Sequence, residues 1–154
     1  MKQFVLSAIL LIIPSLSLAG GHSGFGGIGT GITINSEVME GKSGTLVKNT
    51  TDDVWIWDNL PEGFHKATRA TCTQFLAFAT GQQQPVGFSV TCLSVDPDGD
   101  ATMSVLAPHD SGRALITQVA GTGKWEAYNG IQFLGGTDIQ IDSSTSTYSW
   151  KPIN

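Results

Sequence analysis

The sequence predicts a mature protein that is nearly all β, arranged as a barrel or a sandwich. From about residue 45, short runs rich in β-branched and aromatic residues recur with turn residues between them. One of these runs places Val86, Phe88, Val90 and Cys92 at alternate positions, which is the period of a strand. No segment after residue 19 keeps a helical period for three turns. Many short strands at regular spacing are typical of barrels and sandwiches.

Residues 1–19 have the pattern of a cleaved secretory signal peptide. Lys2 supplies the positive end, residues 4–13 form the apolar stretch, and Ser17-Leu18-Ala19 is a small-x-small cleavage site. A retained anchor is the alternative, but the apolar run is short and Pro14 interrupts it. We therefore predict a secreted or periplasmic protein with no membrane span in its mature chain.

Residues 20–44 are predicted to be a flexible glycine-rich segment and a lead-in to the folded domain. Glycine is concentrated at residues 20–31, and such a composition buries too little surface to offset its ordering entropy. A formal G-x-G-x-x-G occurs at residues 24–29. It lacks the preceding strand and the following helix that a dinucleotide site requires.

A single β-domain is expected over residues 45–154, which is long enough for one hydrophobic core. The predicted strands, in order, are residues 45–48, 54–57, 70–78, 86–95, 102–106, 114–119, 130–133, 139–141 and 145–150.

Cys72 and Cys92 are the only two cysteines of the chain. In an oxidising compartment such a pair tends to form a disulfide. The two lie almost symmetrically about the connection at residues 81–85, so an antiparallel hairpin with a bulge or a loose turn would bring them opposite each other. Two free buried thiols are the alternative.

The charge of the chain argues against two classes of partner. Eight Lys and Arg residues stand against thirteen Asp and Glu residues, for a net charge of −5, and the basic residues do not cluster. Nucleic acids require clustered cations against their phosphates. We therefore expect no nucleic-acid partner, and anionic membrane surfaces are disfavoured for the same reason.

No metal or cofactor site is predicted. Asp96-Pro97-Asp98-Gly99-Asp100 resembles a calcium loop but lacks the glycine and glutamate positions of an EF-hand, and Pro-Asp-Gly is a strong turn sequence. The three histidines have no partners at ligand spacing. They are His22, His65 and His109.

The sequence contains no recognisable catalytic motif. There is no G-x-S-x-G elbow, and disulfide pairing would remove the strongest nucleophile. Most carboxylates near the predicted strands are interpreted as solvated or turn-forming, because sequence alone cannot pair them for acid–base chemistry. They are Asp52, Asp53, Asp58, Glu62 and Glu126.

The segment GTGKWEAYNG, residues 121–130, is interpreted as architectural. A phosphate loop needs a glycine where Gln118 stands and a Ser or Thr where Trp125 follows the lysine. Instead, Gly121 and Gly123 would allow a bulge. A short strand is expected from Trp125 to Tyr128, with Lys124 as an exposed surface residue.

Four motifs together resemble small secreted bacterial proteins of the allene oxide cyclase/dirigent-like, calycin-like superfamily. They are the two cysteines, Asp96–Asp100, Gly121–Trp125 and the terminal Tyr148-Ser149-Trp150-Lys151-Pro152. The resemblance covers roughly residues 45–152 and implies a single antiparallel β-barrel of about eight strands. Members with known activity bind apolar or phenolic small molecules and guide cyclisation or coupling. The resemblance carries over no catalytic residue, because no motif here matches the active site of the cyclases.

Three hypotheses for function follow. The first is a barrel that binds a small apolar or aromatic molecule, the second a barrel isomerase or cyclase, and the third a structural or interaction protein with a filled core. An eight-stranded barrel has room for side chains or for one small ligand. The candidate cavity residues are Trp55, Trp57, Phe75, Phe78, Phe88 and Tyr128, with Glu126 as the carboxylate. Asn49 begins an Asn-Thr-Thr glycosylation sequon that would matter only in a eukaryotic secretory pathway.

Overall fold

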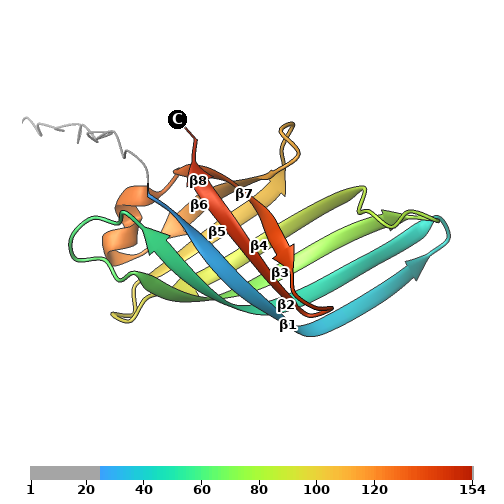
Figure 1. The fold of residues 1–154 in the computed structure, drawn as a ribbon, viewed down its shortest axis with the longest axis horizontal. Coiled ribbons are helices and arrows are strands. Elements are labelled where there is room, and N and C mark those ends of the chain that lie inside the picture. Colours follow the sequence, from blue (N-terminus) through green and yellow to red (C-terminus); the bar gives the residue numbers. More distant parts are fainter. Residues whose placement is uncertain (1–24, 154) are drawn as a thin grey trace, which may run out of the picture.

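The computed structural model describes residues 25–153 and shows one closed, eight-stranded antiparallel β-barrel (Figure 1). This confirms the predicted fold class. The elements are β1 (Gly26–Gly41), β2 (Gly44–Asp58), β3 (Ala67–Ala79), β4 (Gly87–Val95), β5 (Ala101–Pro108), β6 (Ala114–Gly121), the 3₁₀ helix η1 (Gly123–Tyr128), β7 (Gln132–Gln140) and β8 (Thr145–Pro152).

The strands follow one another around the barrel in chain order. Each pairs with the next, and β8 closes the barrel by pairing with residues 27–32 of β1. Because every pair is antiparallel, alternate connections meet at the same end. The connections β1–β2, β3–β4, β5–β6 and β7–β8 form what we call the open end. The connections β2–β3 and β4–β5 lie at the opposite, closed end together with η1 (Figure 1).

Three of the predicted domain and strand assignments are wrong. Residues 26–41 are not a flexible lead-in but the full first strand of the barrel. The predicted strands 45–48 and 54–57 are parts of the single strand β2, and residues 130–133 and 139–141 belong largely to the single strand β7. Glycine and aspartate have low strand propensity, but tertiary pairing on both sides of these segments overrides it. The predicted signal peptide and residues 20–24 lie outside the described residues.

The predicted disulfide is confirmed. Cys72 and Cys92 are directly opposite each other in the register of β3 and β4, and their sulfurs are bonded. The connection between these strands, residues 80–86, is the loose turn that their spacing required. Such a bond is typical of extracellular or periplasmic proteins.

An aromatic cluster fills the closed end. Trp125 of η1 is completely buried, and its ring centroid lies 5.4 Å from that of Trp57 on β2 and 4.9 Å from that of Phe64 in the β2–β3 connection. Phe25 contacts Tyr128 edge-on at 5.2 Å. Edge-to-face contacts of this kind stabilise a core beyond simple burial. The barrel is therefore filled by side chains at this end.

The helix η1 replaces the strand expected from Trp125 to Tyr128. Gly123 begins it with a φ of +52°, and a Cβ there would collide with the side chain of Asp100. The turn of helix directs both Trp125 and Tyr128 into the barrel. A strand would have sent Trp125 and Tyr128 to opposite faces, because successive strand side chains alternate.

Lys124 is not the exposed residue that the sequence suggested. Its side chain is 19% exposed, and its Nζ lies 2.8 Å from a carboxylate oxygen of the buried Asp96. Burial alone would raise the pKa of Asp96. Hydrogen bonds from Lys124, from the Trp125 indole and from two backbone N–H groups outweigh that effect and hold the pKa below its usual value. The surrounding 96–100 segment is a turn, as predicted, with Gly99 at a φ of +91°.

We expect Lys124→Met to lower the free energy of unfolding by about 1–3 kcal/mol. Methionine keeps most of the side-chain volume but leaves the buried charge of Asp96 without its counter-ion and with one fewer donor, and the loss of a hydrogen bond to a buried charge carries a penalty of that size. Urea unfolding at pH 7 measures the change. Lys151→Met, on the exposed end of β8, is the control and should change stability by less than about 0.5 kcal/mol. Equal effects of the two substitutions would contradict the assignment of Lys124 to a structural ion pair.

Candidate functional site

A cavity of about 780 Å³ opens inside the barrel toward the open end. Its lining includes residues of the open-end connections, among them Gln84, Arg113 and Ser144. Ligand pockets in proteins have volumes of roughly 300–1,000 Å³. The barrel is thus filled at one end and hollow at the other.

The cavity has two chemically different walls. One wall comes from β3 to β6 and is largely apolar, and the other comes from β1, β2, β7 and β8 and is largely polar. The apolar wall consists of Leu76, Phe88, Val90, Leu106 and Ile116. The polar wall includes Thr33, Asn49, Thr51, Asp53, Thr137, Ser146 and Tyr148.

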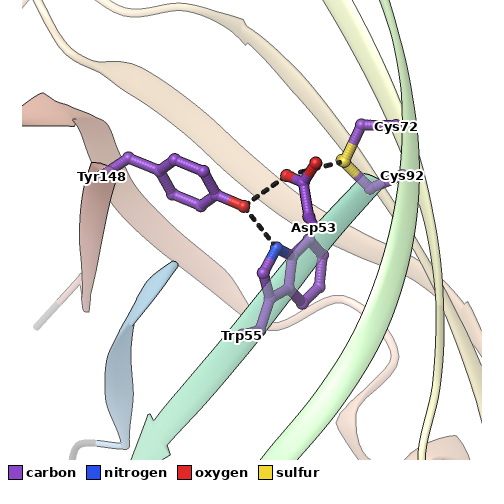
Figure 2. Close-up of a disulfide and its surroundings, with 5 residues drawn as sticks. All are labelled: Asp53, Trp55, Cys72, Cys92 and Tyr148. Atoms are coloured by element: carbon purple, nitrogen blue, oxygen red, sulfur yellow. Dashed lines mark hydrogen bonds between the residues drawn. A yellow bond between two sulfur atoms is a disulfide. The ribbon is translucent and has the colours of Figure 1, made fainter. Parts of the chain in front are cut away.

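A hydrogen-bonded chain of three side chains lies at the inner part of the polar wall (Figure 2). The Trp55 indole N–H donates to the Tyr148 hydroxyl oxygen over 2.7 Å, and the Tyr148 hydroxyl donates to Oδ2 of Asp53. Oδ2 also lies 3.7 Å from the Cys72 sulfur. A disulfide sulfur carries no hydrogen, so this last approach is a contact and not a hydrogen bond. We call Thr51, Asp53, Tyr148 and Trp150 the cavity floor.

Asp53 is the buried carboxyl group of this floor. Asp53 is only 4% exposed to solvent. Burial raises the pKa of Asp53, and the opposing influence of the Thr51, Tyr148 and Trp55 groups does not cancel that effect. Neither Thr51 Oγ1 nor Asp53 Oδ1 has a hydrogen-bond partner among the described residues.

Tyr148 stays protonated in this setting. Burial raises the pKa of its hydroxyl, and the neighbouring Asp53 carboxyl group raises it further. The hydroxyl therefore acts as a fixed donor to Asp53. Its ring has room because Gly29 on β1 lacks a side chain: a Cβ at Gly29 would come within 2.3 Å of the Tyr148 ring. The glycine-rich strand β1 thus makes space for the floor.

Only some of the candidate cavity residues that the sequence suggested line the cavity. Phe88 lines the cavity. Trp55 and Trp57 instead border a small void of about 20 Å³ next to the aromatic cluster, and Tyr128 lies within that cluster. Phe78 is half-buried and is not among the described residues that line the cavity.

Two of those candidates are wrong. Phe75 is 46% exposed, because its place in β3 alternates with the inward-facing Gln74 and Leu76. Glu126 is exposed on η1 at the closed end, away from the cavity. The carboxyl group inside the barrel is that of Asp53, one of the five carboxylates that the sequence alone could not pair for acid–base chemistry. The period-two series Thr51, Asp53, Trp55 was the available signal, since its members share one face of a strand.

Asn49 of the glycosylation sequon also lines the cavity, where it accepts a hydrogen bond from Ser36. Within residues 25–153 no group of His, Cys, Asp and Glu side chains is arranged to hold a metal ion. His65 pairs with Asp98, and His109 bonds to Ser111. No helix in the same range is long and apolar enough to span a membrane.

Comparisons of this chain with protein-family models, with curated proteins and with solved structures find no match. The resemblance to the allene oxide cyclase/dirigent-like superfamily therefore stays a prediction.

Proposed function

We propose that this protein binds a small, largely apolar molecule inside its barrel. The observation that carries the proposal is the cavity of about 780 Å³ with one largely apolar wall. Bringing an apolar molecule against that wall removes its surface from water, which contributes roughly 25 cal/mol per Å². The closed barrel holds the wall in place before the ligand arrives, so little ordering cost opposes binding.

The construction of the barrel supports the same proposal. The aromatic cluster and the disulfide lie at or beside the inner limit of the cavity, and together they stabilise the barrel without filling its open end. A structural protein with a filled core would not need to leave this volume empty, because cavities in cores are destabilising. The third hypothesis from the sequence is accordingly the least favoured.

Binding of the uncharged dye Nile red tests this proposal. We expect saturable binding with enhanced fluorescence, one dye per chain, because the dye leaves water for the apolar wall. Leu106→Glu places a charge on that wall and should weaken binding at least about tenfold, since a charge beside an apolar ligand is poorly compensated.

Leu93→Glu is the matched control for the dye experiment. Leu93 lies on the outer face of β4 and is 58% exposed, so the same substitution there should leave binding within about twofold. Non-saturable binding, or equal effects of the two variants, would contradict binding inside the barrel.

A barrel isomerase or cyclase is the second candidate function, and Asp53 is the observation that favours it. A buried carboxyl group with a raised pKa inside a cavity is a frequent feature of acid–base catalysis. Recovery of bound ligand, followed by mass spectrometry and NMR, separates the two candidates. A binding protein returns the ligand unchanged, whereas an isomerase returns a rearranged product of the same mass.

A further inference from the structure

The cavity floor contains polar atoms that nothing in the described chain satisfies. Three of the buried side-chain atoms without hydrogen-bond partners belong to cavity-lining residues: Thr51 Oγ1, Asp53 Oδ1 and Trp150 Nε1. Buried polar groups in proteins are almost always paired, so such atoms call for an explanation. Thr51 and Asp53 are two positions apart on β2 and therefore face the cavity from the same side.

The hydrogen bonds around Asp53 determine which kind of partner is missing. Tyr148 has a single hydroxyl hydrogen, and it is donated to Oδ2 of Asp53 (Figure 2). The Tyr148 oxygen in turn accepts from Trp55. The carboxyl group is thereby anchored through one oxygen, and its other oxygen, Oδ1, stays free as an acceptor. The missing partner is a hydrogen-bond donor.

The charge of Asp53 narrows the choice of donor. Within residues 25–153 no Lys, Arg or His forms an ion pair with Asp53, whereas the neighbouring Asp52 is paired with Arg69 at 2.6 Å on the outer face. Arg113 lines the cavity but is exposed. An uncompensated buried carboxylate is strongly penalised. A neutral hydroxyl would supply the donor but would leave the negative charge uncompensated. A cation that carries an N–H group supplies both the donor and the compensating positive charge.

We propose that the ligand is a small organic amine with an apolar body, whose protonated nitrogen donates to Asp53 Oδ1 and contacts Thr51 Oγ1. The body lies against the apolar wall of β3 to β6, opposite the floor. This inference rests on the proposed binding function and specifies the chemical class of the ligand.

Three variants isolate the role of the floor. Asp53→Asn keeps a carbonyl oxygen for Tyr148 and the same shape but removes the charge. Thr51→Val removes the hydroxyl at nearly constant volume. Asp52→Asn removes an equal charge from the adjacent position of the same strand, where the side chain faces outward, and is the matched control. Asp53→Asn should fold at least as stably as the wild type, because it removes a charge that burial disfavours.

Isothermal titration with 2-phenylethylamine and 2-phenylethanol at pH 7 tests the inference. The two probes share their apolar body and differ in their polar group. We expect the wild type to prefer the amine by at least about tenfold, the worth of a hydrogen bond to a charged group. Asp53→Asn should abolish that preference while changing alcohol binding by less than about threefold. Thr51→Val should weaken amine binding by a smaller factor. Asp52→Asn should leave the affinity for both probes unchanged.

Three results would overturn the inference. One is equal affinity for amine and alcohol in the wild type, and another is an amine preference that survives Asp53→Asn. The third is an amine preference lost equally in Asp52→Asn, which would indicate general attraction by an acidic protein. If Nile red binds inside the barrel while the amine does not bind, the amine class is wrong and the binding function stands. If neither dye nor amine binds, both proposals fail.

Discussion

Replacing Trp125 by alanine should lower the free energy of unfolding by about 3–5 kcal/mol, the range for removing a large aromatic side chain from a core. Trp125 is completely buried, and its ring contacts Trp57, Phe64 and Tyr128. Its indole N–H also donates to Oδ2 of Asp96 over 3.1 Å. Alanine would leave both a void and a buried carboxylate with one fewer donor.

Urea unfolding followed by far-UV circular dichroism measures this loss. Trp125→Phe separates its two parts, because phenylalanine retains most of the packing and lacks the N–H. We expect Trp125→Phe to lower the free energy of unfolding by about 1–2 kcal/mol. Leu93→Ala, on the exposed outer face of β4, is the surface control and should change stability by less than about 0.5 kcal/mol. A Trp125→Ala loss no larger than that of Leu93→Ala would show that η1 is not part of the core.

The strands of the two cavity walls differ in how well the sequence predicted them. The strands from β3 to β6 were predicted within a few residues, and these strands carry the apolar wall and an alternating pattern of ordinary strand residues. Their local preferences and their place in the fold agree, which is the condition under which sequence patterns predict structure. The disulfide could be predicted for the same reason, because its two cysteines lie almost symmetrically about the turn between two regular strands.

Three of the four strands that form the polar wall were misread, whereas β8 was predicted within two residues. β2 was divided at Asn49–Asp53, and β7 was divided around Gly135–Asp138, where small and polar residues interrupt the strand pattern. Several of those residues line the cavity, including Asn49, Thr51, Asp53 and Thr137. Local pattern and global fold therefore disagree at the candidate site, as is expected where function and not stability selects the residue.

The first strand was missed for a different physical reason. Glycines at alternate positions of β1 face inward, and their missing side chains accommodate Trp150 and Tyr148 from the neighbouring strand β8 and Asp53 from the neighbouring strand β2. A single sequence shows the glycines but not the partners that require them. For the same reason the Asp53–Tyr148 pair could not be predicted, since its members are 95 residues apart and a single sequence does not show which distant residues meet.

Removing the disulfide by the double substitution Cys72→Ala and Cys92→Ala should lower the free energy of unfolding by about 3 kcal/mol. The bond closes a loop of sequence separation 20, and opening it restores conformational entropy to the unfolded chain. The folded barrel itself should persist, because β3 and β4 remain paired from Arg69 to Ala77. The expected loss thus arises mainly in the unfolded state.

Three measurements check this expectation. The intact mass of the wild type should rise by two hydrogens on reduction. Urea unfolding of the reduced wild type should match that of the double variant, since both have lost the same constraint. Titration of the double variant with Nile red should show binding at urea concentrations where the barrel is still folded, because the apolar wall does not depend on the bond.

Unchanged stability in both reduced and substituted protein would show that the bond does not constrain the unfolded chain. Loss of dye binding in a barrel that remains folded would instead place the disulfide, which contacts Asp53, among the groups that shape the cavity.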